Sequence, residues 1–183
     1  MKRLTRIAVW QLIFFFSLSA FAQTANSPLM APMQQAASKL KSVQVTGDPD
    51  YDYVFRMRLL SQGALEMAKV EAQQGADPAA KQKAQAFVDA KQKELADLEA
   101  LQRQMRPSRP NQAYVQQQSR QIEAIVLKMQ PDGVAAKLTG KLDEDFNTLL
   151  TEYNRDASDL SRAYLSFGNN ASVKAVAQKM VAQ

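Results

Sequence analysis

Four methionines are the side chains of this sequence best suited to binding a metal. Met57 and Met67 are ten residues apart, so on a helix they would face the same side, about 15 Å apart along the axis. Met30 and Met33 lie upstream, and thioether sulfur is a soft ligand that suits Cu(I) or Ag(I). Methionines at this spacing most often fill a hydrophobic core, which is the interpretation we favour. The alternative is a copper or silver site at Met57 and Met67, which are too far apart to bind one ion without help from the upstream pair.

Carboxylates form two further clusters with possible chemistry. Asp48, Asp50 and Asp52 make the first cluster, and residues 143–145 make the second. Oxygen ligands of this kind suit hard cations such as calcium, but the spacing of an EF-hand loop is absent. Negative charge in the first turn of a helix is also favoured by the helix dipole. We therefore interpret both clusters as helix starts.

Composition excludes most enzyme classes. The 183 residues include no cysteine and no histidine. Disulfides, zinc ribbons, thiol catalysis, Ser-His-Asp chemistry and histidine-ligated metals are therefore excluded. The sequence predicts a protein that is not an enzyme and that has no cofactor, with copper as the alternative.

Charge argues against a nucleic-acid partner. The formal charge is +5, from 23 basic and 18 acidic residues, but Lys2, Arg3 and Arg6 crowd the first six positions. Without them the charges nearly balance, whereas nucleic-acid binding needs a clustered basic surface. Lys91, together with basic residues at 93, 103, 106 and 109, forms a local stretch. We interpret this stretch as a solvated turn, with contact to an acidic partner as the alternative, and the partner itself is not predicted.

The first 22 residues have the pattern of a secretory signal peptide. A basic start, an apolar run from Ile7 to Ala20 and the small-x-small sequence ending at Ala22 follow in order. A membrane anchor is the alternative, but the run is shorter than the roughly 20 residues that a spanning helix needs. We expect cleavage near Ala22 and a periplasmic or secreted protein that does not span the membrane.

The rest of the chain predicts an all-α antiparallel bundle. Residues 23–47 show no sustained period and are predicted to be a mobile arm, and residues 48–183 form the bundle domain. Aspartate followed by proline starts helices at Asp48 and Asp77, Asn111 and Asn170 are further caps, and glycines end helices. Apolar residues between these signals recur at helical spacing. The pattern predicts about four to five helices in a ferritin-like arrangement.

An offset of 93 residues aligns two parts of the bundle. The identical or similar pairs include Asp50 with Asp143, Asp52 with Asp145, Met57 with Leu150, Met67 with Leu160, and Gly75 with Gly168. The prediction is an internal duplication with halves 48–106 and 143–183, joined by a helix at 111–130. Alternatively, two alanine-rich helical hairpins align this well without common origin.

Residues 48–101 resemble the domain of unknown function 305 family. The resemblance rests on Asp50-Tyr51-Asp52-Tyr53, Met57, Gln62-Gly63-Ala64, Met67-Ala68, Asp77-Pro78, Ala84, Gln92 and Glu94. It implies an exported ferritin-like bundle, in a family that includes proteins of copper handling. Its His-His pair is replaced here by Leu60 and Ser61, and by Tyr153 and Asn154 in the second half. The stretch around Val173–Val181 is also similar to the domain of unknown function 4142 family, which is the second candidate.

These observations predict an exported, non-enzymatic bundle protein with a role in protein interaction or in envelope copper stress. The alternative is a Cu(I) or Ag(I) carrier with methionine ligands. Since no histidine is present, the sequence also predicts stability that is nearly flat between about pH 6 and 8.

Overall fold

The computed structural model describes residues 27–182, and every regular element in that part of the chain is helical. The predicted signal peptide, residues 23–26 of the predicted arm and Gln183 lie outside the described residues. The elements are α1 (Met30–Ser42), α2 (Pro49–Gln74), α3 (Pro78–Gln104), α4 (Gln112–Lys128), the short 3₁₀ helix η2 (Val134–Lys137), α5 (Leu142–Leu165) and α6 (Ala171–Val181). The all-α prediction is confirmed, with six α-helices in residues 27–182 rather than four or five.

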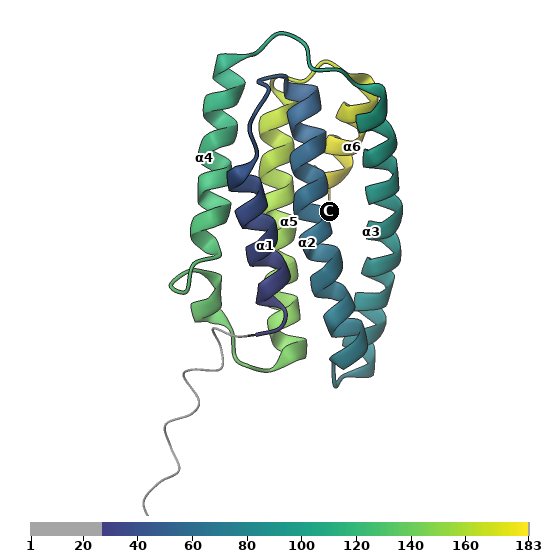
Figure 1. Ribbon diagram of the computed structural model, residues 1–183. Helices are drawn as coiled ribbons and strands as arrows, with labels where there is room; N and C mark the ends of the chain where they lie inside the picture. The colour runs from purple at the N-terminus through teal and green to yellow at the C-terminus, as the bar shows by residue number, and fades with distance from the viewer. Residues whose placement is uncertain (1–26, 183) are drawn as a thin grey trace, which may run out of the picture.

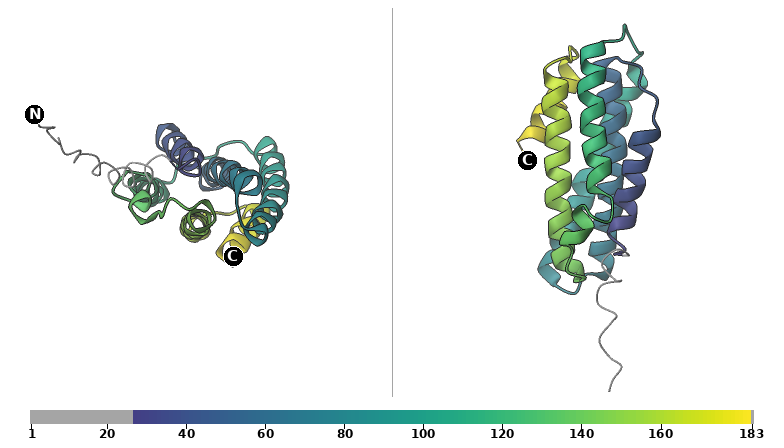
Figure 2. Two further views of the ribbon diagram at one scale, coloured as in Figure 1. Left: turned by 90° about the horizontal axis from the view of Figure 1, so that it is seen from below. Right: turned by 90° about the vertical axis from the view of Figure 1, so that its left-hand side faces the viewer.

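The helices α1, α2, α4 and α5 stand side by side as a long bundle (Figure 1). Consecutive helices run in opposite directions, and α2 and α5 are an antiparallel pair at its centre. Helix α3 packs on α2, and α6 packs on α5 (Figure 2). The two ends of the α2–α5 pair therefore lead directly into α3 and α6.

The predicted caps set the helix starts. The backbone N–H of Tyr51 donates to the side chain of Asp48, and Ala79 donates likewise to Asp77. Asn111 and Asn170 accept from the first turns of α4 and α6 in the same way. These residues satisfy N–H groups that a helix leaves without an intrahelical partner.

Helix α1 corrects the prediction of a mobile arm over residues 23–47. Met30, Met33, Ala37 and Leu40 are at most 3 % exposed and pack in the core. Their spacing is that of one helix face, but Pro32, two glutamines and Ser38 between them interrupt the apolar pattern. Residues 30–42 are therefore a structural helix of the bundle.

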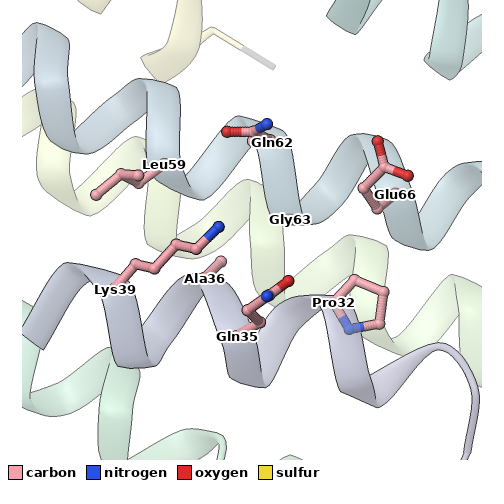
Figure 3. Close-up of a pocket in the computed structure, with 8 residues that line it drawn as sticks. All are labelled: Pro32, Gln35, Ala36, Lys39, Leu59, Gln62, Gly63 and Glu66. Atoms are coloured by element: carbon pink, nitrogen blue, oxygen red, sulfur yellow. The ribbon is translucent and has the colours of Figure 1, made fainter.

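Gly63 lets α1 approach α2 closely. A Cβ atom at position 63 would lie 2.6 Å from the Cβ of Ala36 and 3.1 Å from the carbonyl oxygen of Pro32. Figure 3 shows these residues facing one another beside a hollow of about 120 Å³. The close approach of α1 to α2 therefore depends on the missing side chain at Gly63.

Replacing Gly63 with leucine should force the two helices apart. Because overpacking of this kind costs roughly 1–3 kcal/mol, we expect Gly63→Leu to lower the free energy of unfolding by about that amount in urea. Gln73→Leu, at an exposed position of the same helix, is the matched control and should leave stability nearly unchanged. Equal effects of the two substitutions would contradict the proposed close contact.

Candidate functional site

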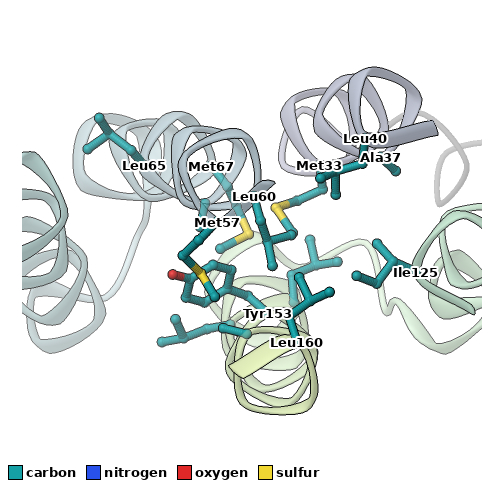
Figure 4. Close-up of a cluster of buried hydrophobic side chains, with 14 of the residues drawn as sticks. Met33, Ala37, Leu40, Met57, Leu60, Leu65, Met67, Ile125, Tyr153 and Leu160 are labelled. Atoms are coloured by element: carbon teal, nitrogen blue, oxygen red, sulfur yellow. The ribbon is translucent and has the colours of Figure 1, made fainter. Parts of the chain in front are cut away.

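The predicted metal ligands Met57 and Met67 lie inside the core. Both side chains are 0 % exposed, and Met30 and Met33 on α1 are 1 % exposed. Figure 4 shows Met33, Met57 and Met67 among leucines and Tyr153. The four methionines thus come from two neighbouring helices, in an apolar environment that suits methionine as a filler. Their role as metal ligands stays a prediction.

The two positions that the resemblance aligns with a His-His pair, Leu60 and Ser61, hold a leucine of the core and a buried serine. Leu60 packs in the core, while the Ser61 hydroxyl donates to Glu94 Oε1 at 2.7 Å. The hydroxyl of Tyr153, which is 93 residues after Leu60, lies 3.1 Å from Ser61 Oγ. Because the Ser61 hydroxyl has one proton and donates it to Glu94, the Tyr153 hydroxyl is the donor to Ser61. Side chains from α2, α3 and α5 therefore meet at Ser61.

Lys91 brings a cation into this cluster. Its ammonium lies 2.6 Å from Glu94 Oε2, and both side chains are under 10 % exposed. The same ammonium lies 4.7 Å from the ring centroid of Tyr153 and 5.2 Å from that of Phe87. Burial lowers the pKa of Lys91, and Glu94 acts in the opposite direction. We call Ser61, Lys91, Glu94 and Tyr153 the Lys91 cluster.

Lys91 was misplaced by the sequence interpretation, which assigned it to an exposed basic stretch. A signal was present in the sequence, because position 91 continues the apolar face formed by Ala84, Phe87, Val88, Leu95 and Leu98. A lysine on such a face needs a partner if it is buried, and Glu94 lies three residues later. Lys93, by contrast, is exposed as expected.

A second set of buried hydroxyls links α2 to α5. Tyr53 lies 2.8 Å from Ser161 Oγ, and Ser161 donates to the carbonyl of Ala157, so Tyr53 is the donor to Ser161. The rings of Tyr53 and Tyr164 stack with centroids 4.3 Å apart. Burial raises the pKa of both tyrosines. They therefore act as neutral hydrogen-bond donors and not as phenolates.

In both carboxylate clusters, an aspartate accepts hydrogen bonds from backbone N–H groups in an equivalent way. Asp52 accepts from the N–H groups of residues 46 and 47, and Asp145 accepts from those of residues 139 and 140. Gly47 and Gly140, with φ of 85° and 80°, form the left-handed turns that these contacts require. Within residues 27–182, no three carboxylates are grouped as a metal site.

Asp50 and Asp143 connect opposite ends of α2 and α5. Asp50 accepts from the backbone N–H groups of Asn169 and Asn170 at 3.0 and 3.1 Å. Asp143 accepts from those of Ala76 and Asp77 at 3.0 and 3.1 Å. The corresponding residues of the two sets (Asp50 and Asp143, Ala76 and Asn169, Asp77 and Asn170) are again 93 residues apart. Each aspartate lies in the first turn of one central helix and accepts hydrogen bonds from the turn that follows the other.

Glu71 is the side chain that departs from this pattern. Tyr164 donates to Asp50 at 2.6 Å, and the residue 93 positions before Tyr164 is Glu71. Glu71 is 0 % exposed, and neither of its carboxyl oxygens has a donor among residues 27–182. Burial, with a hydrogen bond to Asp143 and the charge of that carboxylate, raises the pKa of Glu71 to about 7. A protonated Glu71 therefore donates to Asp143, as Tyr164 does to Asp50.

Glu71 corrects the expectation of flat stability near neutral pH. Its ordinary pKa is 4.5, so between about pH 4.5 and 7 the folded protein holds a proton that the unfolded chain has lost. The free energy of unfolding should therefore fall as pH rises through this window, by at most about 1.4 kcal/mol per pH unit. Above about pH 7 this contribution to the slope should vanish.

Urea unfolding at a series of pH values checks the assignment. Glu71→Gln keeps a donor for Asp143 without a titrating proton, so we expect the slope between pH 5 and 7 to flatten. Glu66→Gln, at a more exposed glutamate of the same helix, should retain the slope of the natural protein. Parallel profiles for all three proteins would show that Glu71 is not the titrating group.

The Lys91–Glu94 ion pair leads to a further prediction, on the free energy of unfolding. Lys91→Met leaves a buried carboxylate without its cation, which costs about 3–5 kcal/mol in comparable pairs. Adding Glu94→Gln to the same protein should recover most of that loss in urea unfolding, whereas Lys93→Met at the exposed neighbour should cost little. Additive losses for Lys91→Met and Glu94→Gln would mean that the two charges do not interact.

Comparison with known proteins identifies one family. The family described as Domain of unknown function (DUF305) matches residues 50–183. No curated relative and no solved structure matches the chain. The family match begins just inside α2 and includes both central helices together with α3, α4 and α6. Because it spans most of the chain, the protein belongs to the DUF305 family.

Proposed function

We propose that this chain is an exported, non-catalytic helical-bundle protein whose role is binding or interaction in the cell envelope. The observation that carries the proposal is the Lys91 cluster. Ser61 and Tyr153 stand where the family pattern has histidine or its equivalent, and they hydrogen-bond to each other and to Glu94. The ammonium of Lys91 supplies the positive charge beside that carboxylate. Because the polar groups of this cluster already have hydrogen-bond or ion-pair partners within the protein, they favour a scaffold role over a metal centre or an active site.

The export part of the proposal is supported by the three-part pattern of residues 1–22, with cleavage near Ala22 and a periplasmic or secreted location. None of the described helices has the length and apolar character needed to cross a bilayer. Amino-terminal sequencing of the protein from the extracytoplasmic fraction should begin near Gln23. A protein that retains Met1 in the membrane fraction would contradict export with cleavage.

We also propose that the bundle arose by internal duplication. The support is the 93-residue offset between Asp50 and Asp143, between Asp52 and Asp145, and between the turns that these residues hold. Hydrogen bonds to specific backbone groups are a stricter criterion than shared alanines. Helices α1 and α4 extend the correspondence, since each precedes a central helix and packs against it.

A soft-metal carrier is the second candidate function. Helix α1 places Met30 and Met33 in the core that also holds Met57 and Met67 of α2, so four thioethers share one apolar interior. Such ligands suit Cu(I) or Ag(I). The carrier requires these buried sulfurs to open toward a metal.

Titration with Cu(I) against a competing chelator separates the two candidates. The scaffold predicts no binding tighter than about micromolar, that is about −8 kcal/mol, and no turnover on a broad panel of hydrolase and oxidoreductase substrates. The carrier predicts tight binding that Met57→Leu and Met67→Leu each weaken, with little change in thermal stability because the volumes match. Turnover on the panel would overturn the non-catalytic proposal.

A further inference from the structure

The outer side of the seam between α1 and α4 is a surface that the bundle leaves uncovered. Helix α1 ends at Ser42, and the segment 43–48 that continues along the seam to α2 is not helical. A hollow of about 330 Å³ opens there, and its apolar walls are formed by Leu40, Val43, Val45, Ile122, Val126 and Leu127. The right-hand view of Figure 2 looks onto this seam, and no described helix lies in front of it. We call these residues, with Lys41 and Glu123 of the same hollow, the α1–α4 face.

The α1–α4 face is apolar at its centre and poor in charge. Leu127 is 61 % exposed, the one large apolar side chain so exposed in residues 27–182. Helix α4 has three charged side chains among 17 residues, whereas α3, which is also an outer helix, has nine among 27. Exposed apolar side chains and a depletion of charge are typical of the centre of a protein–protein interface.

Two unpaired charges of opposite sign lie on opposite walls of the hollow. Lys41 comes from α1 and Glu123 from α4, and both side chains are exposed. Neither forms an ion pair within residues 27–182. A partner with charge of one sign would leave Lys41 or Glu123 opposed by a like charge. The face therefore calls for a partner that has both signs, in the opposite order.

A second copy of the chain meets this requirement. A two-fold axis along the seam places α1 of one copy against α4 of the other, so Lys41 of each copy faces the partner's Glu123. Leu127 of each copy then lies against the α1 wall of the other, where Leu40 and Val43 line the hollow. A standard interface covers about 800 Å² on each partner. Helices of 13 and 17 residues, about 20 and 25 Å long, present a face of that order.

We propose that the α1–α4 face is the interface of a symmetric homodimer. Burial of Leu127 and the hollow around it supplies the affinity, and the two equal pairs of Lys41 with the partner's Glu123 set the orientation. This goes beyond the proposed function, because a monomeric bundle would satisfy that proposal equally well.

Sedimentation of the purified protein at about 1–100 μM, the range in which interfaces of modest affinity fill, tests the association. We expect the mass to rise from one chain to two and to stop there, because a two-fold contact closes on itself. A single chain at every concentration, or growth beyond two chains, would overturn the proposal.

Charge reversal tests the face without depending on the fold. Lys41→Glu alone sets like charges against each other at both symmetric contacts, as does Glu123→Lys, so each should weaken association at least about tenfold. An equal mixture of these two variants should form heterodimers, because every contact between them joins a glutamate with a lysine. Lys93→Glu, the same reversal at an exposed position of α3, is the matched control and should dimerise as the natural protein does. A mixture that stays monomeric, or equal weakening by all three variants, would overturn the assignment.

Discussion

Helices α2 and α5 bury carboxylates, hydroxyls and aromatic rings together with leucines and methionines, so each polar group at their interface needs a partner within the protein. Asp50 and Asp143 satisfy this requirement at opposite ends. Each carboxylate sits at the start of one helix and accepts from the turn that follows the other. The antiparallel pair is thereby fixed at both ends. Because these turns lead into α3 and α6, the directions of the outer helices follow from the same contacts.

The sequence predicted the helix starts better than the contents of the core. Asp48 and Asp77 are local signals, since each acts on N–H groups two or three residues away, and local signals can be read without the fold. Helix α1 lacks such a signal, as no side chain caps its first turn. Its burial depends on Gly63, which is distant in the sequence. The sequence therefore predicts a mobile arm in this region, although Met30, Met33 and Leu40 lie on one helix face.

The candidate site was only partly predictable for the same reason. The resemblance indicates that Ser61 and Tyr153 are site positions, but no local signal in the sequence predicts that their side chains meet. Lys91 on α3 meets Tyr153 on α5 only in the folded bundle. Its ammonium lies over two aromatic rings and beside Glu94. The positive charge therefore comes from within the protein, and no charged ligand is needed to balance the carboxylate. A buried lysine thus gives the core a neutral total charge at this point.

Side chains 93 residues apart show which polar groups the packing of the two central helices needs. Tyr164 donates to Asp50, and the protonated form of Glu71 is able to donate to Asp143 in the same way. Arg56 is different, because the residue 93 positions later is Leu149, which is 0 % exposed and needs no polar partner. A leucine therefore suffices for packing at this place in a central helix. The buried guanidinium of Arg56 has a desolvation cost that Leu149 avoids, and its hydrogen bond to Gln118 with the nearby charge of Asp52 offsets part of that cost.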